Sequence, residues 1–115
     1  MTRERFEQLV EEAIAQLPAR FRRLMENVVV MVADRPPRGR RSKRGRDLLL
    51  GIFEGVPRTE KSVFDTHEPD RIVLYQKNIE AVCETEDEIR EEVRLTVLHE
   101  IGHYFGLSEE ELADL

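Results

Sequence analysis

The sequence predicts an α+β fold, in which a short sheet of three to four strands packs on an N-terminal helix and a long C-terminal helix. Three observations lead to this fold class. Apolar residues recur at helical spacing near the N-terminus, three short apolar runs occupy the middle of the chain, and a capping box precedes a long amphipathic segment. The 115 residues suffice for one domain, 1–115, and leave no room for a second core.

The first helix is predicted from about Thr2 to Leu17. Its apolar residues follow the spacing i, i+3, i+4, i+7, i+8, i+11 and are Phe6, Leu9, Val10, Ala13, Ile14 and Leu17. Thr2 is of the residue type that caps helix N-termini. Pro18 ends this helix and can open a second, short one, because the first position of a helix needs no N–H.

Three runs are predicted to be strands: Val28–Val32, Leu48–Phe53 and Arg71–Tyr75. The segment between the first two is different in kind. Arg38–Arg46 holds six basic residues, two glycines and one serine, so it supplies nothing to a core and we expect a mobile loop. Gly55–Pro57 marks a turn, and Thr59–Pro69 is polar and irregular.

The last long helix is predicted from about Glu86 to Phe105, a length of roughly 30 Å at 1.5 Å per residue. Thr85–Glu88 has the pattern of a capping box, with three acids in the first turn to suit the helix dipole. Gly106 can take the positive φ that ends many helices. Ser108–Glu111 is a second capping box, after which we expect a short terminal helix.

Charge and composition limit which disulfides, membrane segments and cellular locations are possible. The net charge is −6, yet seven basic residues and no acid lie between Arg35 and Arg46. One cysteine, Cys83, excludes an internal disulfide, and we expect it to be a small buried apolar residue. There is no apolar run long enough to span a membrane, and Met1–Gln8 lacks the apolar core of a secretory signal. We therefore expect a cytoplasmic monomer.

The segment His99–His103 reads H-E-x-x-H and lies well inside the predicted long helix. The spacing i, i+4 places both imidazoles on one helix face, where each can present a nitrogen to one zinc ion. Glu100 lies about 100° round the helix, so it is suited to take a proton from a metal-activated water. The alternative is a pair of histidines at a polar rim with no metal.

The residues after the pair extend the motif to H-E-x-x-H-x-x-G-x-x-E. In metzincin-type sites a glycine at the place of Gly106 lets the chain reverse, so that the residue ten positions after the first histidine reaches the metal. Here that residue is Glu109, whose carboxylate can bind zinc. Alternatively, Glu109 is an acid in the first turn of the terminal helix. The other candidates for third ligand are Glu110, Glu111, Asp114, His67 and water.

These residues resemble the small bacterial zincin-like metallopeptidases, or minimal zincins. The resemblance rests on His99–Glu109, and Asn27–Val30, Leu49–Pro57 and Arg71–Tyr75 support it. It implies a minimal zincin-like fold with a short mixed sheet over the active-site helix. It also implies Zn²⁺ on His99, His103 and Glu109, with Glu100 as the catalytic general base. The basic loop Arg38–Arg46 departs from the family pattern, and too few residues follow Glu109 for the Met-turn of larger metzincins.

The sequence thus predicts a zinc-dependent metallopeptidase acting on a peptide or protein substrate, which would pair with Arg71–Tyr75 as an edge strand. Tyr104 is expected to pack in the core, with polarisation of a substrate carbonyl as the alternative. Two other functions stay open. One is a zinc endoribonuclease of the small ribosome-associated type, for which Arg38–Arg46 would contact phosphates, although Glu100 and the acidic body disfavour nucleic acid. The other is a non-catalytic zinc-containing binding module.

Overall fold

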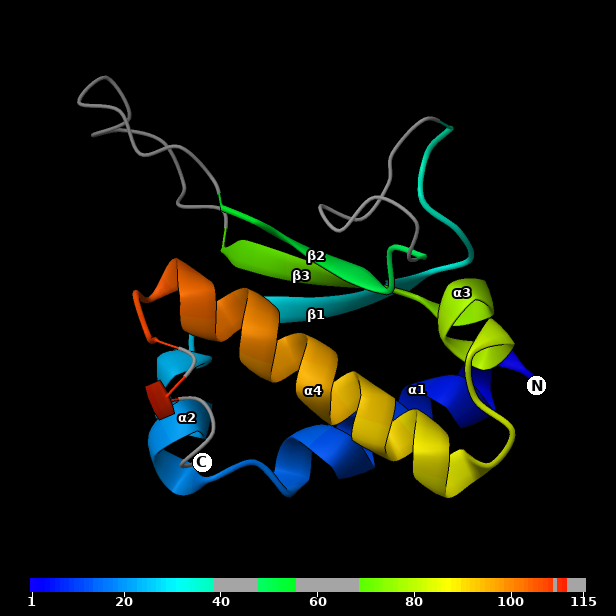
Figure 1. The fold of residues 1–115 in the computed structure, drawn as a ribbon, viewed down its shortest axis with the longest axis horizontal. Helices are drawn as coiled ribbons and strands as arrows, with labels where there is room; N and C mark the ends of the chain where they lie inside the picture. Colours follow the sequence, from blue (N-terminus) through cyan, green and yellow to red (C-terminus); the bar gives the residue numbers. More distant parts are fainter. Residues whose placement is uncertain (39–47, 56–68, 109, 112–115) are drawn as a thin grey trace.

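The structure is a computed structural model and describes residues 1–38, 48–55, 69–108 and 110–111. Apart from their end residues Arg38 and Pro69, the predicted loops Arg38–Arg46 and Thr59–Pro69 lie outside these ranges. Helices and a three-stranded sheet form two layers (Figure 1). In chain order the elements are α1 (Arg3–Ala15), α2 (Ala19–Leu24), β1 (Val28–Ala33), β2 (Gly51–Glu54), β3 (Asp70–Tyr75), α3 (Gln76–Ala81) and α4 (Glu86–Tyr104). The predicted α+β class, with a short mixed sheet packed on an N-terminal helix and a long C-terminal helix, is confirmed.

The helix caps account for most of the boundaries. The Thr2 hydroxyl accepts a hydrogen bond from the Arg5 N–H at 3.1 Å, so α1 begins where the sequence predicted. At α4 the Thr85 hydroxyl accepts from the Glu88 N–H at 3.1 Å. The Glu88 carboxylate in return accepts from the N–H of Glu84, one residue before the cap, at 3.2 Å. Pro18 differs from the prediction in one detail, because it is the N-cap of α2 and not its first helical residue.

The second strand begins later than the sequence predicted. Leu49 and Leu50 precede β2, and their carbonyl oxygens are bonded to α3 and to the last residue of β3. The Leu50 carbonyl accepts from the Tyr75 N–H at 2.9 Å, and the Leu49 carbonyl accepts from Asn78 Nδ2 at 2.9 Å. Asn78 belongs to α3, a six-residue helix that is too short to show an apolar period in the sequence.

The order of the strands is β1-β3-β2, with β3 parallel to β1 and antiparallel to β2. This order corrects one expectation. The segment Arg71–Tyr75 is the central strand and not an edge, because both of its sides are hydrogen-bonded to neighbouring strands. Within the described ranges, the two edges of the sheet are β1 and β2.

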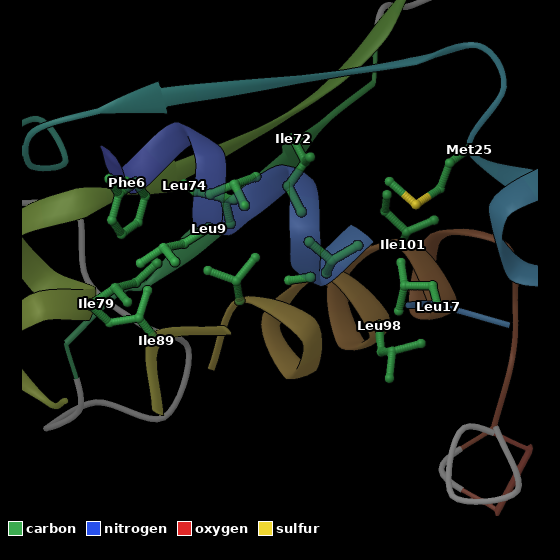
Figure 2. Close-up of a cluster of buried hydrophobic side chains, with 14 of the residues drawn as sticks. Phe6, Leu9, Leu17, Met25, Ile72, Leu74, Ile79, Ile89, Leu98 and Ile101 are labelled. Carbon is green, nitrogen blue, oxygen red and sulfur yellow. The ribbon is translucent and has the colours of Figure 1, made fainter. Parts of the chain in front are cut away.

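The core lies between one face of the sheet and the helices α1 and α4. Ile72 and Leu74 of β3 point into it, together with Phe6 and Leu9 of α1 (Figure 2). From α4 it receives the stripe that consists of Ile89, Val93, Val97, Leu98 and Ile101. The N-terminal helix and the last helix thus share one core. No helix among the described residues is long and apolar enough to cross a membrane.

Ion pairs join α1 and α4 at their surface. Arg5 donates two hydrogen bonds to the Glu86 carboxylate, at 2.9 and 2.7 Å. The Arg5 guanidinium thereby lowers the pKa of Glu86 below its ordinary value. Arg90 in α4 donates to Glu12 in α1 at 2.7 Å. Because these pairs are exposed, we expect them to fix the relative orientation of the helices more than to add stability.

A buried glycine lets α4 approach β2 closely. A Cβ atom on Gly51 would lie 2.8 Å from Thr96 Cγ2 and 3.1 Å from the Val73 carbonyl oxygen. Neither neighbour is the far end of a flexible side chain. Farther along the same two elements, the rings of Phe53 and Tyr104 are stacked with their centres 4.1 Å apart. Strand β2 and helix α4 therefore run side by side in the same direction, from Gly51 and Thr96 to Phe53 and Tyr104.

We predict that Gly51→Ala lowers the free energy of unfolding by about 1–3 kcal/mol, because the added methyl group overpacks the contact with Thr96. Urea denaturation measures the loss. The double variant Gly51→Ala with Thr96→Ser is the control, since serine lacks the crowding methyl group and should restore part of the stability. Equal stability of the single variant and the parent would show that the two elements are not in close contact.

Candidate metal centre

The two histidines of the H-E-x-x-H motif lie in the C-terminal part of α4. The ring centres of His99 and His103 are 5.9 Å apart, and their planes are nearly perpendicular at 88°. A zinc–nitrogen bond is about 2.1 Å and the ring centre lies about 1.1 Å behind the nitrogen, so two imidazoles at the tetrahedral angle on one zinc have centres about 5.2 Å apart. The observed separation is a little wider than this, so the pair lies close to the spacing that a shared zinc ion needs.

One of these histidines is already oriented by the helix. His99 Nδ1 lies 2.9 Å from the carbonyl oxygen of Leu95, one turn earlier. A carbonyl oxygen can only accept, so this contact favours, for the neutral ring, the tautomer with the proton on Nδ1 and the lone pair on Nε2. Metal-binding histidines typically make such a hydrogen bond through the nitrogen that does not bind the metal. The tautomer of His99 therefore suits a ligand.

Glu100 is rotated round α4 by about 100° from His99 and by about 60° from His103. It lies four residues after Thr96 and four before Tyr104, and both of these residues contact β2. Glu100 therefore belongs to the stripe that faces β2, and its side chain is half-buried. The helix thus presents two imidazoles on one side and a carboxylate on the side of the edge strand.

A left-handed glycine ends the helix, as the sequence predicted. Gly106 has φ +77°, and the hydrogen bonds around it are those of a Schellman motif. The Leu107 N–H donates to the Gly102 carbonyl at 2.8 Å, and the Gly106 N–H donates to the His103 carbonyl at 3.0 Å. Leu107 also packs against the core. The chain therefore reverses direction three residues after His103.

The predicted third ligand, Glu109, lies outside the described residues, and so do the alternatives His67 and Asp114. The part of the chain that is described contains no cluster of three or more His, Cys, Asp or Glu residues able to hold a metal. The second capping box is confirmed. The Ser108 hydroxyl accepts from the Glu111 N–H at 3.1 Å, and the Glu111 carboxylate accepts from the Ser108 N–H at 3.3 Å. This bond gives Glu111 a structural role at the helix cap.

Two further expectations were made for single residues. Tyr104 was expected in the core, but the side chain is 51% exposed and its ring rests on Phe53. Phe53 drew no attention in the sequence because it lies in an ordinary apolar run. Cys83 precedes α4 and packs half-buried against the core. Burial is the main cause that raises the pKa of its thiol to about 11, so it remains protonated at neutral pH.

We predict that Gly106→Ala lowers the stability of the protein by about 1–2 kcal/mol, because a Cβ atom strains the left-handed backbone. We expect the cost to come from the backbone, since among the described residues no atom beyond the two chain neighbours lies within 4 Å of the added Cβ. Gly106→Asn should cost less, because asparagine tolerates this conformation better. Thermal unfolding of the two variants compares them, and equal losses would contradict a backbone origin.

Comparison with known proteins found a matching family and a similar solved structure. The family model of the zincin-like metallopeptidases matches residues 25–115. The structure also resembles that of a conserved hypothetical protein from Thermus thermophilus, with 26% sequence identity, a TM-score of 0.60 and 98% of each chain covered. None of the curated proteins searched matches the sequence. Because the family model spans most of the chain and includes the histidine pair, the protein belongs to the zincin-like metallopeptidase family.

Proposed function

We propose that this protein is a zinc-dependent peptidase, in which His99, His103 and Glu109 hold Zn²⁺ and Glu100 is the general base. One observation carries the proposal. The helix α4 presents a pair of imidazoles, of which that of His99 is oriented by the bond from Nδ1 to the Leu95 carbonyl, next to a carboxylate that faces an edge strand. Membership of the zincin-like metallopeptidases supports the same chemistry.

Each residue of the proposed site has its own role in hydrolysis. A bound zinc ion would polarise the scissile carbonyl and bring the pKa of water down to about 7. Glu100 takes the proton from the attacking water and returns it to the leaving amine. Leu95 fixes the ring of His99 through its carbonyl oxygen, so that Nε2 keeps its lone pair. Gly106 turns the chain so that Glu109 can approach the histidine pair.

The position of the substrate strand follows from the observed order of strands. The peptide cannot pair with β3, which is central, so we assign this role to the edge strand β2. Strand β2 lies beside the half of α4 that carries the motif, since Phe53 and Tyr104 are in contact. An extended peptide added to β2 would pass alongside Glu100.

The first prediction concerns the metal. Purified protein should contain about one zinc per chain, because two imidazoles and one carboxylate complete a three-ligand site. His99→Ala, His103→Ala and Glu109→Ala should each lose it. His67→Ala and Asp114→Ala are matched controls and should keep it. Metal analysis of zinc-replete protein tests this. If Glu109→Ala keeps the zinc and one of the control variants loses it, the residue changed in that control is the third ligand.

The second prediction concerns the base. Glu100→Gln should keep the zinc but lower peptide hydrolysis by about 10²–10⁴-fold, because glutamine cannot accept the proton from water. A peptide library incubated with parent and variant measures this. Cleavage at the parent rate would contradict the role of Glu100. Cleavage of RNA that survives Glu100→Gln would favour the endoribonuclease, and binding of peptides without any cleavage by the parent would favour the binding module.

A further inference from the structure

Two large aromatic side chains at the end of α4 are exposed, although the other large apolar residues of this helix are buried or half-buried. Tyr104 is 51% exposed and Phe105 is 41% exposed. Tyr104 lies one helical turn after Glu100, and Phe105 follows it at the C-cap, so the two aromatic residues lie next to the proposed general base. Exposed aromatic residues that are contiguous with a polar site are typical of ligand-binding surfaces.

These side chains are part of a larger aromatic surface. The ring of Tyr104 stacks on that of Phe53 with centres 4.1 Å apart, and it meets the ring of Phe105 edge-on with centres 5.1 Å apart. The three rings form a continuous ledge from the edge strand β2 to the end of α4. We call Phe53, Tyr104 and Phe105 the aromatic ledge.

The ledge is held in place before any ligand arrives. Gly55 follows β2, and a Cβ atom at this position would lie 3.3 Å from Tyr104 Cε2 and 3.4 Å from Phe53 Cε1. The absence of that atom leaves room for both rings. Phe105 is the C-cap residue, and its N–H donates to the Ile101 carbonyl at 3.0 Å. An ordered apolar surface binds a ligand at a lower cost in entropy than a mobile one.

The aromatic ledge lies on the face of the sheet to which every second side chain of an added strand would point. Phe53 pairs with Ile72 of β3, and Ile72 is fully buried beneath the helices. Phe53 therefore points to the helical face of the sheet. In a peptide paired with β2, the residue opposite Phe53 would point to this same face and would meet Tyr104. Its neighbours along the peptide would point to the opposite face.

We propose that the aromatic ledge is a specificity subsite that receives a large apolar or aromatic side chain of the substrate close to the scissile bond. The proposal rests on the proposed peptidase function. A phenylalanine side chain would cover the exposed parts of Tyr104 and Phe105, whereas an alanine would cover little of either. We therefore expect peptides with phenylalanine at this position to bind about tenfold to 100-fold more tightly than those with alanine.

The binding experiment uses the zinc-loaded full-length chain with Glu100→Gln, so that peptides are bound and not consumed. Two series of otherwise identical peptides carry phenylalanine or alanine at one position, and calorimetry gives their dissociation constants. We expect a clear preference for phenylalanine in one register. Phe105→Ala and Tyr104→Ala, each added to this background, should remove most of the preference without changing the zinc content.

The test includes a matched control variant and a replacement for Tyr104→Ala. Val82 is also 51% exposed but belongs to the C-cap of α3, so Val82→Ala should leave the preference intact. If Tyr104→Ala does not fold, Tyr104→Leu replaces it and should reduce the preference. Cleavage of peptides by the parent without a preference, or a preference that persists in Phe105→Ala and the Tyr104 variant, overturns the subsite alone. Failure of the parent to cleave any peptide overturns the proposed function, and the subsite with it.

Discussion

The burial of one face of α4 is the interaction on which the rest of the structure depends. Ile89, Leu98 and Ile101 of this helix share one core with residues of α1 and β3 (Figure 2). The same 19-residue helix carries His99, Glu100 and His103 on its other faces. Removing the apolar stripe from water fixes the rotation of the helix, and that rotation decides where the two imidazoles and the carboxylate point. The chemistry is therefore positioned by hydrophobic packing.

The contact between α4 and β2 sets the geometry on the side of the helix that faces β2. Gly51 and Thr96 bring the backbones close at one end, and the stacked rings of Phe53 and Tyr104 hold the other end. Glu100 lies between these two contacts on the same stripe. Since β2 is short, with only four residues, this side of the sheet is defined more by the helix than by the strand. A small protein can in this way form a wall beside the H-E-x-x-H motif without a separate subdomain.

Local signals in the sequence predicted most of the helices well, because caps act over three or four residues. Thr2, Thr85 and Gly106 each have the role that their residue type suggested. The order of the strands could not be predicted, since the apolar pattern of Arg71–Tyr75 fits a central strand and an edge strand equally well. The exposure of Tyr104 was not predicted, because helical spacing placed this residue on the apolar stripe. Whether that end of the stripe is covered depends on the path of β2, which the sequence does not show. Within the site, the spacing of His99 and His103 was readable, whereas the bond from His99 to the Leu95 carbonyl needed coordinates.

The central position of β3 has a consequence for the synthesis of the chain. Val28 of β1 pairs with Asp70 of β3, so the first strand leaves the ribosome about 40 residues before its partner. During that interval Val28–Ala33, which contains no charged residue, has no strand to pair with among the described elements. At about 5–20 residues per second the delay amounts to roughly 2–8 s. We expect the nascent protein to be most prone to aggregation in this period, and the emergence of residues 70–75 to end it by allowing all three strands to assemble at once.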